Sequence, residues 1–340
     1  MQELKLITEP DTSLLDKYNK FTSESEIDFV MIDWNMGNTC NYSCTYCDDH
    51  IHNGTFPWAD IEVAFEWAKK CTDHYKSLGK RILWNLLGGE PTVWKDFISF
   101  FNRVKDYDPD CRIRVLTNGS RTVAWWNKAS KYLDDVIISY HPESADIQHL
   151  LKVSDVLREN KVFHTMQVCL YPPYLDKCYE AADEFYNKSK CNAVIIKSLK
   201  VTLSSPETFL YDQDYLDKVL KFDDIPVWTK ENIDGDDMKN PFVRFSYFTD
   251  GKEKLFVKDG GNELMRKGQN TWKGWDCYIG IETLVVGMDG RVTSGSSCNH
   301  DCDLGNIHDP KNIEFPTKPT TCKWTWCSCL ADIEVTKIKR

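Results

Sequence analysis

The sequence of 340 residues lacks any long apolar run. No stretch approaches the roughly 20 apolar residues that a membrane-spanning helix needs. Its first five residues also lack the basic stretch followed by an apolar stretch that an export signal requires. Internal repeats and low-complexity segments are missing too. These absences argue against a helical membrane protein and predict a cytoplasmic location.

An excess of positive charge is absent as well. The chain has 42 Lys and Arg against 52 Asp and Glu, a net charge of -10. Sequence-independent binding to nucleic acid needs a basic surface, so a nucleic-acid partner is not expected. The composition, 41% apolar and 28% charged residues, is that of an ordinary globular protein.

Cysteine, by contrast, is abundant, with 14 residues in two groups and a scattered remainder. Three cysteines lie at positions 40, 44 and 47, and six lie between 277 and 329. Disulfides are rare in the cytosol, where clustered thiols more often bind metal. The grouping therefore predicts two metal sites. We expect the other five to pack as small apolar residues: Cys71, Cys111, Cys169, Cys178 and Cys191.

Residues 28 to 200 alternate between short β-rich runs and helical patterns. We predict strands at 28–34, 81–87, 112–117, 136–140, 162–170 and 193–198. Apolar residues at helical spacing predict helices within 61–78, 97–104, 147–157 and 175–188. Six successive β/α units predict an α/β fold with a parallel sheet, arranged as a partial (β/α)6 barrel. In such folds the site lies at the carboxyl ends of the strands.

The character of the sequence changes after about residue 200. Residues 242–257 and 281–293 are typical of β-hairpins, each with an Asp-Gly turn. We predict four parts: an N-terminal extension (1–25), a core partial barrel (26–202), a linker with a β-hairpin (203–270), and a small C-terminal β-hairpin/helix cluster-binding domain (271–340).

The first cysteine group has the spacing C-x3-C-x2-C and follows the first predicted strand. Three thiolates on a short loop can ligate three irons of a four-iron cluster and leave the fourth iron open. A zinc site is the alternative, because His50 or His52 could supply the fourth ligand that zinc normally takes.

This spacing, the aromatic Tyr46 before the last cysteine and the position after the first strand resemble the radical S-adenosylmethionine (SAM) superfamily. The resemblance implies that Cys40, Cys44 and Cys47 hold a [4Fe-4S] cluster whose open iron binds SAM. It also implies reductive cleavage of SAM to a 5′-deoxyadenosyl radical. A low-potential electron donor such as flavodoxin or ferredoxin is then an expected partner.

Further motifs support the resemblance. Gly88-Gly89-Glu90-Pro91, after the second strand, resembles the family's GGEP motif, whose backbone groups and Glu carboxylate bind the SAM ammonium. Thr117-Asn118-Gly119 and Ser139 resemble positions that bind the SAM carboxylate and ribose, although the first is also a common turn and the second could cap a strand. Leu199 and Tyr46 are candidates for contact with adenine. His141 is expected to be structural or to line the substrate site.

The second cysteine group resembles the twitch domain, a shortened SPASM domain that holds one auxiliary iron–sulfur cluster. A cysteine precedes the second hairpin and the others follow it, as in that domain. The expected ligands are Cys277 and Cys298 together with two of Cys322, Cys327 and Cys329. Cys302 is the least expected of the six, and structural zinc remains an alternative.

The function that the resemblance implies is that of a radical SAM oxidoreductase. It would abstract a hydrogen from a C–H bond of a peptide or protein side chain, with the auxiliary cluster taking the second electron and no side chain acting as the catalyst. Dehydrogenation or rearrangement of a small molecule or nucleotide is an alternative. A non-catalytic zinc or iron–sulfur interaction module is an alternative of another class.

Overall fold

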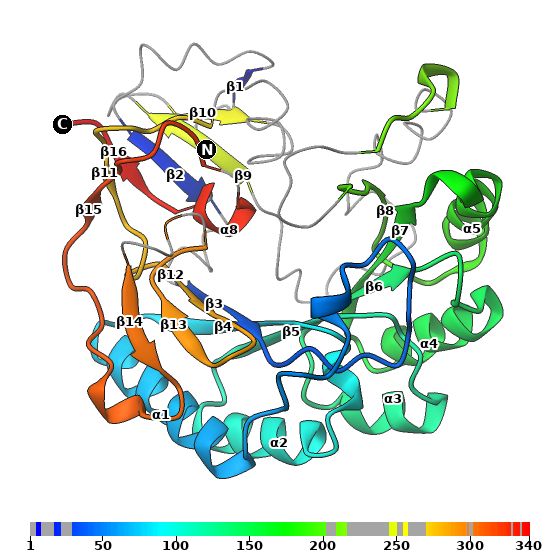
Figure 1. Ribbon diagram of the computed structural model, residues 1–340, viewed down its shortest axis with the longest axis horizontal. Helices are drawn as coiled ribbons and strands as arrows, with labels where there is room; N and C mark the ends of the chain where they lie inside the picture. The colour runs from blue at the N-terminus through cyan, green and yellow to red at the C-terminus, as the bar shows by residue number, and fades with distance from the viewer. Residues whose placement is uncertain are drawn as a thin grey trace. The chain divides into compact units, whose positions relative to one another are not determined.

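The computed structural model describes most of the chain (Figure 1). The described residues are 5–7, 17–21, 29–201, 209–215, 245–249, 254–257, 270–296, 298, 302–327, 329–333 and 335–340. Most of the predicted linker lies outside these residues. The chain divides into two compact units: the first unit comprises Met1–Trp34, Glu62–Trp84 and Phe242–Arg340, and the second unit comprises Asn35–Ile61 and Asn85–Pro241. The four predicted domain bounds remain a prediction.

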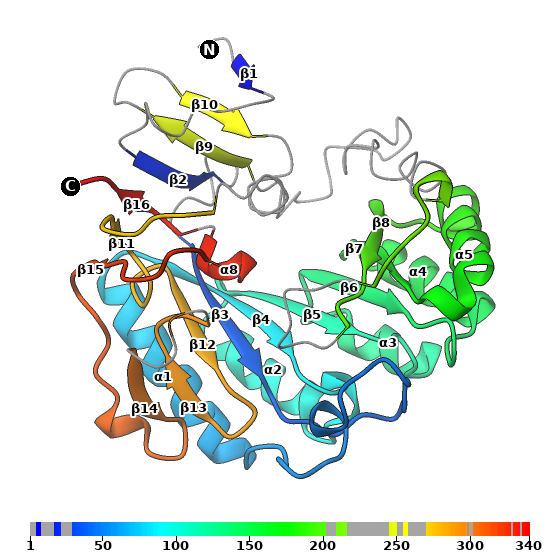
Figure 2. The ribbon, with the colours of Figure 1, turned by 45° about the horizontal axis from the view of Figure 1, so that its top comes forward.

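Strands and helices alternate through the predicted core. They are β3 (Phe29–Asn35), α1 (Ile61–Ser77), β4 (Arg81–Leu87), α2 (Phe97–Tyr107), β5 (Arg112–Thr117), α3 (Val123–Ala129), β6 (Asp135–Tyr140), α4 (Ile147–Glu159), β7 (Phe163–Leu170), α5 (Leu175–Lys188) and β8 (Ala193–Ser198). Strands β3 to β8 are neighbours in chain order, and β5 to β8 pair in parallel. In the second unit, α3, α4 and α5 lie along one face of β5 to β8 (Figure 2). The predicted α/β fold with a six-stranded parallel sheet is confirmed as a partial barrel.

Local sequence explains why these elements form. In α2, Phe97, Phe100, Phe101 and Val104 are all at most 2% exposed and recur at helical spacing, so one face of the helix is buried. Helix α1 ends before Gly79, whose φ of +69° is a conformation that glycine adopts without strain. Helix α3 was not predicted, because seven residues span only about two turns and give too little periodicity.

The C-terminal hairpin at 281–293 is confirmed and belongs to the core sheet. Strand β12 (Thr283–Val286) pairs in parallel with β3, from Thr283 opposite Met31 to Val286 opposite Trp34. Strands β13 (Arg291–Thr293) and β14 (Asp303–Asn306) follow in antiparallel pairing, giving the order β14-β13-β12-β3-β4-β5-β6-β7-β8. Within the first unit, the hairpin therefore extends the edge of the sheet at β3, which the sequence did not predict.

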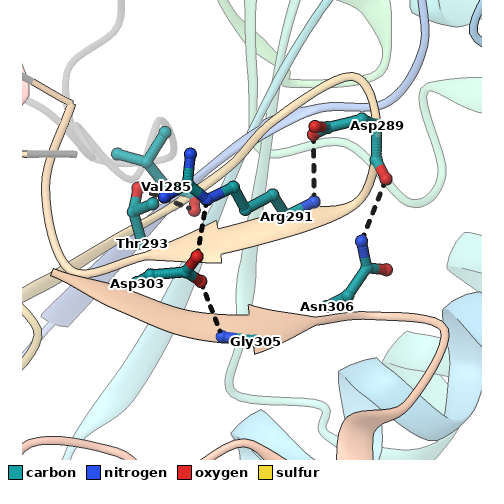
Figure 3. A network of polar contacts seen from close by, with 7 residues as sticks. All are labelled: Val285, Asp289, Arg291, Thr293, Asp303, Gly305 and Asn306. Carbon is teal, nitrogen blue, oxygen red and sulfur yellow. Dashed lines mark hydrogen bonds and ion pairs between the residues drawn. The ribbon is translucent and has the colours of Figure 1, made fainter. Parts of the chain in front are cut away.

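A polar network holds this hairpin to β14, as Figure 3 shows. Arg291 Nε donates to Asp303 at 2.9 Å, and Asn306 Nδ2 donates to the Asp289 carbonyl at 3.1 Å. The Asp289 carboxylate accepts from the Arg291 backbone N–H at 3.1 Å, as an Asp before a glycine in a turn commonly does. These contacts lie at the surface and stabilise the turn.

A second sheet lies within the first unit and has the order β1-β10-β9-β2-β16-β11-β15. Its strands are β1 (Lys5–Ile7), β2 (Lys17–Phe21), β9 (Phe245–Thr249), β10 (Lys254–Val257), β11 (Asp276–Cys277), β15 (Thr320–Thr321) and β16 (Lys337–Ile338). The antiparallel pairing of β9 with β10 confirms the first predicted hairpin. Strands β1 and β2 were not predicted; they pair with β10 and with β9 and β16, so the N-terminal residues contribute to this sheet.

Short helical turns complete the secondary structure: η3 (Asp49–Ile51), η4 (Pro91–Val93), η5 (Pro172–Tyr174), η6 (Pro310–Asn312) and the one-turn helix α8 (Leu330–Ile333). The prediction for the five scattered cysteines is confirmed, since each is at most 4% exposed. Over the part of the chain that the structure describes, no helix is both long and apolar enough to cross a membrane.

Candidate functional site

The first cysteine group lies on a loop that follows β3, and one buried asparagine closes this loop. Asn38 is 0% exposed. Its amide nitrogen donates to the His50 carbonyl and to Asn53 Oδ1, both at 2.8 Å, and its oxygen accepts from the Phe56 N–H at 2.8 Å. These bonds fix residues 38–56, which we call the cysteine loop, as one closed segment. Sequence reasoning missed Asn38, because a lone asparagine in a loop carries no motif signal.

The glycine pair after β4 lies against the backbone of the cysteine loop. A Cβ atom added to Gly88 would stand 2.4 Å from the Gly37 carbonyl oxygen, and one added to Gly89 would stand 2.4 Å from that of Thr39. The amides bond across this contact, Gly89 N to Gly37 O at 3.0 Å and Glu90 N to Thr39 O at 2.8 Å. The glycines are therefore needed for close packing of the cysteine loop.

Glu90 links the β4 and β5 loops. It is 1% exposed, and its carboxylate accepts from the Thr92 backbone N–H at 3.1 Å and hydroxyl at 2.5 Å, from the Thr117 hydroxyl at 2.7 Å and from the Asn118 N–H at 2.6 Å. Burial raises the pKa of this carboxyl, and the hydrogen bonds from Asn118, Thr92 and Thr117 oppose the shift. Most of its acceptor capacity is thus used inside the protein.

The three thiols of the loop lie near enough to one another for their charges to interact. Burial raises the pKa of Cys44 to about 12 and that of Cys47 to about 11. The charge of neighbouring cysteines, including Cys40, raises both pKa values further. Cys40 Sγ accepts from the Tyr42 N–H at 3.4 Å and lies 4.0 Å from the Asn118 amide nitrogen. Thiols with raised pKa values are protonated at neutral pH, so binding of iron would release their protons.

An iron–sulfur cluster and a zinc ion need different arrangements of their ligands. Among the described residues, no three His, Cys, Asp or Glu side chains converge as the ligands of a single metal ion do. The thiolates of a four-iron cluster each bind a different iron and so surround a cube and not a point. His50 is exposed, and His52 Nε2 lies 3.3 Å from the Cys47 carbonyl oxygen.

Tyr46 joins the cysteine loop to the end of β6. Its hydroxyl is hydrogen-bonded to His141 Nδ1. Its ring lies 6.0 Å from that imidazole at 13° and 4.7 Å from the Tyr171 ring at 51°. Burial, aided by Lys197, lowers the pKa of His141 to about 4, so the imidazole is neutral at pH 7. His141 therefore serves as a neutral partner that orients Tyr46.

The other predicted residues lie at neighbouring strand ends. Thr117 and Asn118 are buried at the end of β5, and Ser139, 9% exposed on β6, accepts from Gln167 Nε2 at 3.1 Å. Leu199, half-buried after β8, is hydrogen-bonded through its backbone to Tyr211 and Phe209. All of these belong to the second unit together with the cysteine loop.

Sequence reasoning also missed Glu143 and Tyr171, two polar residues at the same strand ends. Glu143 accepts from the Thr45 N–H and hydroxyl, both at 2.8 Å, and the Thr45 hydroxyl also lies 2.8 Å from the Tyr171 hydroxyl. A single glutamate after a strand carries no signal of such a role. The network fixes the stretch of the loop between Cys44 and Cys47.

The C-terminal cysteines of the first unit gather around one apolar cluster. Cys277, Ile279 and Val335 form it, and three further cysteines pack against it: Cys298, Cys302 and Cys322. Cys327, 8% exposed, lies close enough to Cys298 to raise its pKa. We call Cys277, Cys298, Cys302, Cys322 and Cys327 the C-terminal cysteine group. Cys302, the least expected ligand, belongs to it.

Cys329 packs elsewhere. It lies against a cluster of Phe29, Met31, Leu83 and Ala331. Burial raises its pKa to about 12, with further contributions from the charges of Asp332 and Asp33. Cys329 therefore packs against a different apolar cluster from the C-terminal cysteine group.

A buried lysine accompanies that group. Lys337 is 1% exposed and lies directly opposite Cys277 in the antiparallel pair β11–β16, so the two side chains share a face. Its ammonium donates to the carbonyls of Asp332, Ile333 and Val335 at 2.6, 2.9 and 3.0 Å, and it lies 4.5 Å from the Trp272 ring centre. Its positive charge lowers the pKa of Cys277, which burial raises.

The fold has parallel strands, and a closed loop with three cysteines lies at their carboxyl ends. These features define a class of α/β protein that binds an iron–sulfur cluster. Comparison with known proteins makes the class specific. Residues 34–169 match the family model for the radical SAM superfamily.

Its similarity to curated proteins covers part of each chain. A GTP 3′,8-cyclase of Haemophilus influenzae is 28% identical over 207 residues, 58% of this chain and 52% of that protein. One of Pectobacterium atrosepticum is 26% identical over 187 residues, 54% and 50% of the two chains. The chain thus spans about half the length of the curated relatives it matches.

Two solved structures share the fold. The first is native anSMEcpe with bound AdoMet and Cp18Cys peptide, with a TM-score of 0.51, 17% identity and coverage of 83% of this chain and 77% of that chain. The second is Streptococcus suis SuiB bound to S-adenosylmethionine, with a TM-score of 0.51, 9% identity and coverage of 84% and 65%. At these identities the likeness concerns the fold alone.

Proposed function

We propose that the chain is an enzyme that reductively cleaves SAM and uses the product to take a hydrogen atom from a C–H bond of its substrate. The observation that carries the proposal is the set of three thiols on the cysteine loop, held by Gly88-Gly89 within the matched family region. Cys40, Cys44 and Cys47 would bind three irons of a [4Fe-4S] cluster. With SAM on its open iron, such a cluster supplies the 5′-deoxyadenosyl radical.

The chain's own residues position this chemistry. The amide of Asn118 lies beside Cys40 Sγ and Asn41 Oδ1, so it fixes the first ligand relative to the β5 loop. Tyr46 is held by His141 and Tyr171 and presents an aromatic face suited to adenine. Ser139 and Leu199 lie at strand ends where they would contact ribose and adenine.

The contacts of Glu90 indicate that it positions neighbouring residues and does not bind SAM directly. Because its carboxylate already accepts four hydrogen bonds, we assign the SAM ammonium to backbone carbonyls of the Gly88–Glu90 segment. Glu90 then acts as a positioning residue that holds Thr117 and Asn118 in place. Its buried negative charge also favours a cationic ligand nearby.

We place an auxiliary iron–sulfur cluster at the C-terminal cysteine group. Four of its five thiols would complete a four-iron cluster, and Cys329 is left out of the ligand set. Such a cluster can take the second electron of a two-electron oxidation. Lys337, paired with Cys277, would offset part of the negative charge of the thiolates.

For the substrate we propose a peptide or protein side chain. One protein of the same fold binds the Cp18Cys peptide. Tyr171, next to the cysteine loop, has its ring 6.0 Å from that of Phe209, and Glu143 adds a carboxylate, a mixture that suits an amphipathic side chain.

A nucleotide is the second candidate, because the curated relatives named above are GTP 3′,8-cyclases. A nucleotide substrate requires cationic groups for its phosphates near the strand ends. Lys197 on β8, whose charge acts on His141, is one such group.

The proposal is tested by anaerobic reconstitution with iron and sulfide, followed by incubation with SAM and dithionite. We expect 5′-deoxyadenosine from the wild type and none from the Cys40→Ala/Cys44→Ala/Cys47→Ala variant. Production by this variant would refute the site. Adding GTP or a peptide library then assigns the substrate, because the true substrate increases 5′-deoxyadenosine and is itself converted to a product that chromatography and mass spectrometry distinguish from it.

A further inference from the structure

An open pocket of about 500 Å³ lies beside the cysteine loop in the second unit. Its lining includes Asn41 from the cysteine loop, Val93 from the β4 loop, Ser120 and Arg121 from the β5 loop, and Trp125 and Lys128 from α3. Asn41 and Lys128 are exposed, so the pocket opens at the surface. The function proposed above makes no use of it.

The pocket is cationic in an acidic chain. Two of its lining residues, Arg121 and Lys128, carry positive charge and none is a carboxylate, whereas the whole chain has a net charge of -10. The Arg121 guanidinium lies 5.2 Å from the Trp125 ring centre, which holds it in place. Its Nε is buried without a hydrogen-bond partner among the described residues.

The pocket wall connects directly to a cluster ligand. Asn41 follows Cys40 in the chain, and its amide nitrogen donates to the Ser120 hydroxyl at 2.8 Å. Its oxygen accepts at 3.0 Å from Asn118 Nδ2, which lies 4.0 Å from Cys40 Sγ. A ligand bound in the pocket would contact Asn41, the residue next to Cys40. Asn41 is also linked to the Cys40 thiol through the side chain of Asn118.

We propose that this pocket is the docking surface for an acidic, low-potential electron-transfer protein. The inference rests on the proposed function, because reductive cleavage of SAM consumes one electron. The reduced carrier of the partner, a flavin or an iron–sulfur cluster, loses one electron, and the cluster held by Cys40, Cys44 and Cys47 gains it. Carboxylates of the partner face Arg121 and Lys128, and Trp125 with Val93 supplies the apolar part of the contact.

The lining favours a protein over a small anion. Aromatic and arginine side chains beside aliphatic ones are the composition of protein interfaces. Complementary charge raises the rate of encounter and makes that rate depend on salt. Electron transfer complexes are transient and bury little area, which an open pocket of this kind matches.

The test is the rate at which the reconstituted protein is reduced by two acidic probes, reduced flavodoxin and reduced ferredoxin, in stopped flow at low salt. Wild type is compared with Arg121→Glu/Lys128→Glu and with Lys190→Glu, a control for charge at an exposed lysine of the same unit. We expect at least one probe to reduce the double variant at least about tenfold more slowly than the wild type. The rate for the double variant should also depend less on salt concentration. The control should match the wild type.

Reduced methyl viologen, a small cation that needs no docking, should reduce all three proteins at the same rate. Equal rates of the wild type and the double variant with both protein probes, or no reduction of the wild type by either, would overturn the docking surface. Calorimetry that finds binding of GTP or pyrophosphate to the wild type and not to the double variant would also overturn the docking surface. Cluster reduction without 5′-deoxyadenosine would instead refute the proposed function and leave the docking result standing.

Discussion

Two buried ionisable side chains, Glu90 and Lys337, show how single residues hold the candidate sites in place. Each is 1% exposed. Glu90 accepts hydrogen bonds from the β4 and β5 loops, and Lys337 donates to the carbonyls of α8 and of Val335. A buried charge is tolerated only where such partners replace water. Both residues therefore act on the sites through the backbone they fix.

Replacing Glu90 tests this role. Glu90→Ala leaves the buried donors of Thr92, Thr117 and Asn118 without an acceptor, so we expect a loss of about 3 kcal/mol in the free energy of unfolding. Glu90→Gln keeps one acceptor oxygen and should lose less. Urea denaturation measures both; equal stability of Glu90→Ala and wild type would contradict the account.

The same residue predicts a pH dependence. Because burial raises the pKa of Glu90 above its ordinary 4.5, the folded state holds the proton more tightly than the unfolded state. The stability that this group contributes is complete below pH 4.5 and is lost as pH rises through the folded pKa. The stability difference between wild type and the non-titrating Glu90→Gln should therefore decline from pH 4.5 upwards, and a rise would have the wrong sign.

Lys337 offers a second test at this scale. Lys337→Met preserves the apolar stem but removes the donor to three carbonyls, so we expect a loss of about 2 to 4 kcal/mol. Lys339→Met, at an exposed position two residues along, should change stability by less than about 0.5 kcal/mol. Thermal or urea unfolding of the two variants decides; similar losses in both would remove the special role of Lys337.

At the scale of elements, the packing of the cysteine loop against the β4 loop decides where the thiols lie. Gly89→Ala places a Cβ 2.4 Å from the Thr39 carbonyl oxygen, which the loop can relieve only by moving. We expect loss of most of the iron at this site after reconstitution. Gly79→Ala, where nothing lies within 4 Å of the added Cβ, should lose about 1 kcal/mol of stability and keep its iron. Retention of iron by Gly89→Ala would show that the contact is dispensable.

The sequence predicts the repeating elements well and the tertiary pairings poorly. Strand 81–87 and helix 175–188 were predicted to the residue. Gly79 and Gly88 mark the limits of the strand, and apolar periodicity after Pro172-Pro173 marks the helix. Helix α3 and the strands β1 and β2 were missed, since short elements carry little periodicity. No local pattern could show that β12 pairs with β3, because that pairing joins residues about 250 apart.

For the site, residue types were easier to predict than partners. The cysteine triplet and Gly88-Gly89 stand out in the sequence, whereas Asn38, Asn41 and Glu143 become visible only through their contacts. Whether Cys302 or Cys329 joins the C-terminal cysteine group likewise depends on packing, not spacing.

At the scale of the whole molecule, two cysteine groups in two units predict two clusters that can be removed separately. Wild-type protein should hold about eight irons after reconstitution, and the Cys40→Ala/Cys44→Ala/Cys47→Ala variant about four. Cys277→Ala/Cys298→Ala/Cys322→Ala should also hold about four, whereas Cys329→Ala should keep about eight. Iron and sulfide analysis measures these numbers; loss of iron from Cys329→Ala would restore that residue as a ligand.

The central claim is that three thiols leave one iron open to SAM, and electron paramagnetic resonance tests it most directly. The test uses the reduced Cys277→Ala/Cys298→Ala/Cys322→Ala variant, in which the cluster of the cysteine loop should be the one that remains. Its spectrum is recorded before and after SAM is added. We predict that SAM changes the g-values of that cluster. An unchanged spectrum at saturating SAM would contradict the account.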